Sequence, residues 1–404
     1  MSDPRHTQAA GVYQYLLEKI AAGVVEVRFS VFHPLESAHI DDDAKPMALK
    51  RAEVIKALSG KKCFLWWSEL INLEAICLAS GEKIDANTYA FKDDGRWFPS
   101  VDGIANDVKG ILEKELRRGL AKIPLPRNQK RQYRAQFIRN GRLTKAAIEV
   151  MKPGRREVME KVRQKFPLPD WAYDEDIFFR VAAGELHAKH LVGALEEAFA
   201  DLPTFIGWAY DEYDKEKELT AWLRDGTYIR LIEEIRAEID PLVERGATLG
   251  IDASEVNRQF KSMKTRIYEV RERVLWHVYS ETREARRRKG IDRKIWEARV
   301  VKSPVGSIPS FDTMMEVSAD YFTTSALSAP NRRNLLVSDY GDIMHMIYMP
   351  YVDLFRCDAY ASSLASSCAK KYNTKIIKKL SELPLAIDAL LAAKISAAEG
   401  HSPI

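Results

Sequence analysis

Three carboxylates in one short stretch near the carboxyl end of the chain could serve metal-dependent chemistry. They are Asp339, Asp342 and Asp358, within the sequence SDYGDIMHMIYMPYVDLFRCD at residues 338–358. Oxygen ligands of this kind bind Mg²⁺ and Mn²⁺, which activate water for the hydrolysis of phosphodiester bonds. Carboxylates that lie close together repel one another unless a cation is present, so a cluster of them is most readily explained as a metal site.

Two predicted elements would bring these acids to one place. Asp342 is expected to open a short helix, because apolar residues recur at helical spacing from there until Pro350 stops it. Residues 351–357 are rich in Val, Leu and Phe and predict a buried strand, with Asp358 at its end, where α/β proteins place their chemistry. The alternative for Asp339 and Asp342 is helix capping, since an acid at a helix start accepts amide hydrogens.

The amino-terminal part of the chain adds a fourth candidate acid. A helix over residues 12–20 is expected to stop at Gly23, followed by a strand over residues 24–29 and a helix that carries Glu36. Another helix is predicted over residues 51–60. Glu36 is interpreted as a metal-site acid, and the alternative is an exposed helix glutamate, which is what most glutamates are.

The segment GVVEVRFSVFHPLES at residues 23–37, together with the helix, turn, strand and Asp of residues 338–358, resembles the PIN-like nuclease family. The match is to the longer, insertion-bearing members. This resemblance implies an α/β fold in which a PIN-like parallel sheet is flanked by helices, with a large and mostly α-helical insertion. The nuclease-like domain would comprise residues 1–84 and 301–392. The insertion would comprise residues 85–300 and include a basic segment at 116–163.

The same resemblance assigns roles to the acids. It implies that Glu36, Asp342 and Asp358 bind Mg²⁺ or Mn²⁺, and that Asp339 acts as a ligand or orients water. All four are therefore candidate catalytic residues, and Asp353 is a reserve candidate. Two histidines lie near these acids in the sequence. We interpret His33 and His345 as polar packing residues, and the alternative is a general base.

Members of the family begin with a strand that ends in a metal-binding Asp. No such strand precedes Val12 in this chain. A parallel sheet without a central strand leaves backbone groups unpaired, so we expect weak divalent-metal affinity for the chain as given. The alternative function is consequently a catalytically inactive, degenerate or truncated PIN-like protein that binds nucleic acid or a partner.

The strongest charge bias lies between Leu116 and Ile148, where there are ten basic residues and no acidic one. With Tyr133 and Phe137 interleaved, this is the composition of a surface that follows a phosphate backbone and stacks occasional bases. The alternative is a solvated helical face. The predicted nucleic-acid-binding residues are Arg117, Arg118, Lys122, Arg127, Lys130, Arg131, Arg134, Arg139 and Arg142.

Composition places the chain among core-forming globular proteins. It has 404 residues, of which 46% are hydrophobic and 30% charged, and its net charge is only +4. Any affinity for nucleic acid must therefore come from where the charges sit. The four cysteines fit no zinc pattern, no apolar run reaches the length of a membrane span, and the first residues do not resemble a signal peptide. We expect a cytoplasmic protein without a membrane partner.

These patterns lead to one principal hypothesis about function. It is a metal-dependent nuclease that hydrolyses phosphodiester bonds, with RNA preferred over DNA on family analogy alone and with a toxin or defence role as its setting. The expected partners are nucleic acid and a protein that docks on the helical insertion.

Overall fold

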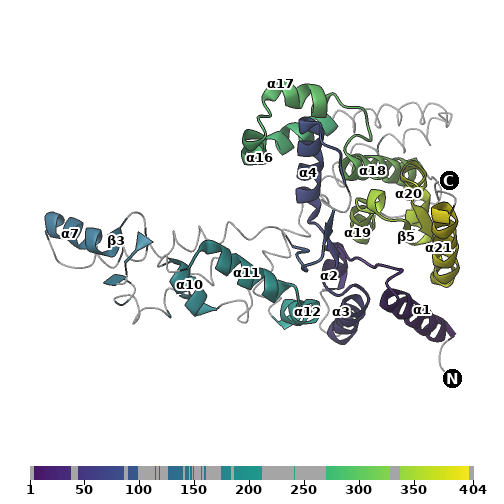
Figure 1. Cartoon of the computed structure of the whole chain (residues 1–404), viewed down its shortest axis with the longest axis horizontal. Helices are drawn as coiled ribbons and strands as arrows, with labels where there is room; N and C mark the ends of the chain where they lie inside the picture. Colours follow the sequence, from purple (N-terminus) through teal and green to yellow (C-terminus); the bar gives the residue numbers. More distant parts are fainter. Residues whose placement is uncertain are drawn as a thin grey trace. The chain divides into compact units, whose positions relative to one another are not determined.

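The computed structural model describes most of the chain. The described residues are 4–37, 44–85, 90–98, 126–139, 142–144, 174–182, 186–211, 270–327 and 337–399, with a few single positions between 114 and 160 and at 241. The chain forms two compact units. The first comprises Met1–Glu36, Val54–Asp93 and Asp225–Ile404, and the second comprises Ser37–Glu53 and Asp94–Arg224. Figure 1 shows the elements of both, and most of them are helices.

The sheets of the first unit are small. Strand β1 (Cys63–Phe64) pairs antiparallel with β2 (Phe91–Lys92), and β5 (Leu354–Arg356) pairs parallel with β6 (Lys375–Ile377). Phe29 adds one parallel bridge to Cys63, where the amide of Phe64 donates to the carbonyl of Phe29 at 2.8 Å. The architecture is therefore helical with small mixed sheets, each of two strands among the described residues.

Helix α4 (Trp67–Ser80) is at the centre of the largest described core of the first unit. Its residues Ile71 and Ile76 pack with Trp296 at the end of α17 (Arg293–Trp296). The π-helical turn η4 (Glu297–Val301) and helix α18 (Pro309–Leu327) complete this core, and a short helix α16 (Arg283–Arg288) precedes them. Gly81 ends α4 in the left-handed conformation, with φ of 77°. Only a residue without a Cβ adopts that conformation at no steric cost.

A second core positions the elements that carry the candidate acids. Helix α19 (Val337–Met346), the 3₁₀ turn η5 (Met349–Tyr351) and helix α20 (Ala359–Tyr372) pack on the second half of α18. Strands β5 and β6 lie on either side of α20 in the chain. Ala365 and Cys368 of α20 are fully buried here, so small side chains allow the helix to approach its neighbours closely.

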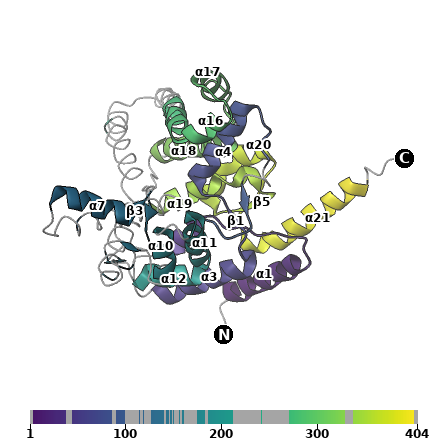
Figure 2. The same cartoon turned by 60° about the vertical axis from the view of Figure 1, so that its left-hand side comes forward.

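The chain ends pack together. Helix α1 (Pro4–Ala21) contributes Val12 and Leu16 to a small core with Ile387 of helix α21 (Leu383–Glu399), which follows the turn η6 (Leu380–Glu382). Figures 1 and 2 both show α1 and α21 side by side. Lys19 of α1 forms an ion pair of 2.8 Å with Asp388 of α21. None of the described helices is both long and apolar enough to cross a bilayer.

The described residues of the second unit form helices and one hairpin. Helices α11 (Ala188–Phe199) and α12 (Leu202–Asp211) enclose an aromatic core in which Trp97 stacks edge-on to Phe205 at 4.9 Å. Helix α10 (Glu175–Ala182) precedes them. Helix α7 (Arg127–Phe137) leads directly into the hairpin of β3 (Ile138–Arg139) and β4 (Arg142–Leu143). Helix α3 (Lys45–Ser59) contributes residues to both units.

Several expectations from the sequence need correction in detail. Residues 24–29 do not form a strand, and only Phe29 pairs with a neighbour. The described residues do not form the parallel sheet expected from the PIN-like resemblance, because their parallel pairings are limited to that bridge and the β5–β6 pair. Residues 270–300 were assigned to the insertion, yet their apolar side chains pack into the α4 core of the first unit.

Candidate functional site

Glu36 lies on helix α2 (Phe32–Ser37) and reaches across to helix α19, about three hundred residues further along the chain. Its Oε1 atom is 3.3 Å from Nε2 of His345. It also lies so close to the backbone at Gly341 that a methyl group there would collide with it. Gly341 precedes Asp342 directly, so Glu36 lies against the part of α19 that carries Asp342.

Asp342 and Asp358 both lie near the buried thiol of Cys357. Burial raises the pKa of Cys357 to about 11, and the negative charges of Asp358 and then Asp342 contribute to this shift. Both carboxylates must therefore be close enough to act on the same sulfur atom. Asp342 and Asp358 have local structural roles that differ from those expected from the sequence.

Asp342 lies inside α19 rather than at its start, since the helix already begins at Val337. The expectation that Asp342 opens this helix is wrong by about one turn, because the apolar pattern used to locate the start omits the polar first turn. Asp358 follows β5 and caps α20, where its Oδ1 atom accepts the amide of Ala361 at 2.7 Å. Asp339 is on α19, but its side chain lies outside the described residues.

The chemistry of this donor set suits a hard cation, because carboxylate oxygens are the ligands that Mg²⁺ and Mn²⁺ prefer. The side chain of Glu36 is half exposed, so a cation has access to it. Among the described residues, no three His, Cys, Asp or Glu side chains come together as a group that could hold a metal ion. Glu36 thus approaches the backbone of α19, and the charges of Asp342 and Asp358 both act on Cys357.

Asp353, the reserve candidate, is not part of this convergence. Its side chain is more than half exposed and pairs with Lys394 of α21 at 2.8 Å. A surface ion pair of this kind needs no metal to explain it.

The structure places two histidines next to each other, one of them beside Glu36, and the sequence did not predict this pair. His33 of α2 and His345 of α19 have ring centroids 4.3 Å apart, and both Nδ1 atoms lie within hydrogen-bond distance of Oγ of Ser30. Burial, with a smaller contribution from His345, lowers the pKa of His33 to about 3. His33 is therefore a neutral, partly buried histidine that packs against His345. The three-residue spacing of Ser30 and His33 at a helix start was the feature of the sequence that could have indicated a contact between them.

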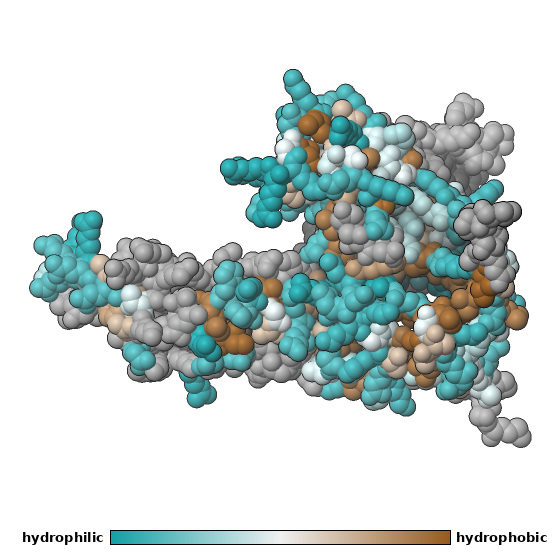
Figure 3. Space-filling model, in the orientation of Figure 1, coloured by the Kyte–Doolittle hydropathy of each residue, from teal (hydrophilic) through white to brown (hydrophobic). Residues whose placement is uncertain are grey.

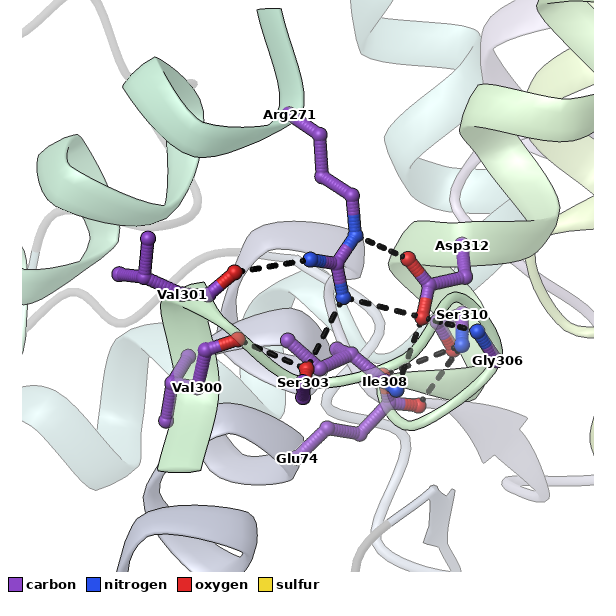
Figure 4. Close-up of polar contacts among 9 residues, drawn as sticks. All are labelled: Glu74, Arg271, Val300, Val301, Ser303, Gly306, Ile308, Ser310 and Asp312. Carbon is purple, nitrogen blue, oxygen red and sulfur yellow. Dashed lines mark hydrogen bonds and ion pairs between the residues drawn. The ribbon is translucent and has the colours of Figure 1, made fainter. Parts of the chain in front are cut away.

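A second polar centre lies inside the α4 core (Figure 4). Both carboxylate oxygens of Glu74 accept the amide of Ser310 at 3.1 Å, and Tyr351 donates its hydroxyl to Oε1. Burial raises the pKa of Glu74 to about 7, against hydrogen bonds that lower it. Beside it, Asp312 forms a buried ion pair with Arg271, at 2.7 Å between Oδ1 and Nε. Sequence reasoning did not identify this centre, because neither acid occurs in a recognisable spacing.

The basic segment belongs to the second unit and is described only in part. The side chains of Arg127 and Arg131, four residues apart on α7, are exposed, as is that of Arg118. Arg139 and Arg142 face each other in the β3–β4 register. Arg117 and Lys122 lie outside the described residues, as do the side chains of Lys130, Arg134, Arg139 and Arg142. Figure 3 shows a hydrophilic surface over α7.

No protein-family model, curated protein or solved structure matches this chain.

Proposed function

We propose that this protein is a metal-dependent nuclease of PIN-like type that hydrolyses phosphodiester bonds in RNA. The observation that carries the proposal is the approach of Glu36 to Gly341, the residue before Asp342, across about three hundred residues of sequence. His345 holds the carboxylate of Glu36 against α19 although Asp342 lies on the same helix, and a bound cation would offset the repulsion between the two acids. The shared influence of Asp342 and Asp358 on Cys357 supports the same convergence.

In this proposal Glu36, Asp342 and Asp358 hold Mg²⁺ or Mn²⁺, and Asp339 acts as a further ligand or orients water. The bound metal would supply an activated water and offset the charge that develops on the leaving oxygen. The carboxylates of the chain hold the ion and direct the water toward the phosphorus. The basic residues of α7 and its hairpin, Arg127 and Arg131 among them, provide contact with the phosphate backbone that does not depend on base sequence.

Cleavage of labelled single-stranded RNA and DNA in Mn²⁺, in Mg²⁺ and in EDTA tests this function directly. We expect cleavage of RNA that requires the metal and is lost in Glu36→Gln and in Asp342→Asn. Glu284→Gln, at an exposed carboxylate on α16, and Asp353→Asn serve as matched controls and should cleave like the unmodified protein. Equal loss in the controls, or cleavage that persists in EDTA, would contradict the assignment.

The second candidate is a catalytically inactive protein that binds nucleic acid or a protein partner. The capping bond from the amide of Ala361 to Asp358 favours it, because that bond accounts for this acid without a metal. RNA binding without cleavage in any of the three conditions would support this candidate over the nuclease.

A further inference from the structure

A chain of polar contacts runs from the interior of the first unit to Glu36. Oγ of Ser30 lies 3.0 Å from Nδ1 of His345 and 3.2 Å from Nδ1 of His33. On the other side of the same ring, Nε2 of His345 lies 3.3 Å from Oε1 of Glu36. One imidazole therefore joins a buried hydroxyl to a carboxylate at the surface.

The positions of the protons follow from the partners when His345 is neutral. Glu36 can only accept, so Nε2 of His345 must carry the hydrogen and Nδ1 must be the acceptor. The amide of Ser30 already donates to Nδ1 of His33 at 3.1 Å. The single hydroxyl hydrogen of Ser30 then points to His345, because Nδ1 of His33 already accepts the amide hydrogen whereas Nδ1 of His345 needs a donor. The order of donation is Ser30 to His345 to Glu36.

The exposed fraction of the residues rises steadily along this chain of contacts. Ser30 is 1% exposed, the side chain of His345 is 15% exposed and that of Glu36 is 50% exposed. A hydroxyl as buried as that of Ser30 cannot attack a substrate, which excludes a nucleophilic role. The rings of Phe32 and His33 pack edge-on against His345 and fix its plane. The buried end is thus rigid, and the exposed end is the acid proposed to bind metal.

We infer that Ser30 and His345 are positioning residues for Glu36: the imidazole holds the carboxylate against α19, and the serine hydroxyl selects the tautomer that can donate to it. The identity of the bound ion rests on the proposed function, whereas the contacts of His345 with Ser30 and Glu36 do not. Partners of this kind orient metal-binding carboxylates, and their loss typically lowers metal affinity about 10- to 100-fold.

Two substitutions of His345 separate the two bonds. In His345→Gln the side-chain amide nitrogen reaches the place of Nε2 and keeps the bond to Glu36. In His345→Asn the amide oxygen replaces Nδ1 and keeps only the bond to Ser30. Mn²⁺ titration by calorimetry on the full chain should show affinity within about threefold of the unmodified protein for His345→Gln. It should show a loss of about tenfold or more for His345→Asn.

Equal losses of Mn²⁺ affinity in the two variants, with thermal unfolding unchanged, would overturn the inference. Both variants lose the imidazole ring, but only His345→Asn loses the contact with Glu36. A second readout does not depend on metal. Nitrogen NMR of histidine-labelled protein should show His345 with its hydrogen on Nε2, and Glu36→Ala should shift population to the other tautomer. A hydrogen on Nδ1 in the unmodified protein would overturn the inference. If Mn²⁺ does not bind at all while the NMR result holds, the nuclease proposal fails and the positioning role stands.

Discussion

At the scale of single residues, the burial of acids differs sharply between the two polar centres of the first unit. Glu36 is half exposed and open to a ligand, whereas Glu74 is fully buried and held by protein groups alone. Glu74 is faced by Ser310 and Asp312 on α18, by Tyr351 on η5 and by Tyr372 on α20. Arg271 is linked to Glu74 through its ion pair with Asp312. Burial outweighs these hydrogen bonds, and the acid gains a proton near neutral pH.

The raised pKa of Glu74 gives the folding stability a pH dependence of unusual sign for an acid. The folded state binds the proton below a pKa of about 7 and the unfolded state below the ordinary value of 4.5. Between these values the folded state binds more protons, so stability falls as pH rises through that window, by roughly 3 kcal/mol in all. We predict that Glu74→Gln removes this slope. Urea unfolding from pH 4 to 8.5 measures it.

Glu284→Gln, on the surface of α16, is the control for the pH experiment and should keep the slope of the unmodified protein. If the free energies of unfolding of Glu74→Gln and the unmodified protein run parallel over the whole range, Glu74 does not titrate near neutral pH.

At the scale of elements, α18 begins at a loop that a buried ion pair organises. Oδ2 of Asp312 accepts the amides of Gly306 at 2.6 Å and Ile308 at 3.0 Å, while Arg271 donates to the carbonyl of Val301 and to Oγ of Ser303. The pair thus ties the connection between η4 and α18 to the preceding segment. Removing one partner leaves a buried charge without compensation.

We predict that Asp312→Ala and Arg271→Met each lower the free energy of unfolding by about 3–5 kcal/mol. The double variant should lose clearly less than the sum, with a coupling on the order of 2 kcal/mol. Chemical unfolding of the four proteins gives the coupling. The exposed pair Arg288 and Glu284 on α16 is the matched control, and its coupling should be close to zero. Additive losses for the buried pair would show that it is not coupled.

Helix α19 contains a glycine where helix propensity alone favours alanine. A Gly to Ala change in a helix interior usually stabilises by about 1 kcal/mol. At Gly341 the new methyl group would displace the carboxylate of Glu36, which is the end of a flexible side chain and can move at little cost to the fold. We therefore predict weaker Mn²⁺ binding in Gly341→Ala, with a gain in melting temperature similar to that of the control Gly11→Ala on α1, where nothing lies within 4 Å. Unchanged Mn²⁺ binding in Gly341→Ala would place Glu36 away from α19.

At the scale of the whole molecule, the proposed chemistry and the basic segment belong to different compact units. The net charge of +4 is too small to attract nucleic acid by itself, so binding must depend on the local charge of residues such as those on α7. Binding and cleavage are therefore separable by substitution in one unit or the other.

Charge reversal on α7 tests the contribution of the second unit. We predict that Arg127→Glu with Arg131→Glu weakens binding of single-stranded RNA at low salt. Each lost phosphate contact should also flatten the dependence of log K on log salt by about 0.7. Arg287→Glu, on the exposed face of α16, serves as control. Fluorescence anisotropy over a salt series measures both effects. An unchanged slope in the α7 variant would return this segment to the interpretation as a solvated helical face.

The sequence by itself determined part of the local structure. Helical spacing predicted the second halves of α1 and α3, both of which begin earlier than expected, and Gly23 follows the end of α1 with positive φ. These features depend on neighbours in the chain, which is why periodicity and turn residues indicate them. The position of Asp358 after a strand was also predictable, and β5 is that strand.

Only the tertiary structure decided which distant residues meet. The contact of Glu36 with α19, the bond of Ser30 to His345 and the seating of Glu74 under α18 each join segments that lie more than two hundred residues apart. Such pairings depend on how whole helices pack, and a single sequence carries no local signal for them. The shortness of the strands also emerged only in the structure, where β1–β2 pairs two residues and β5–β6 pairs three, because the length of a pairing depends on a partner strand that a local pattern does not identify.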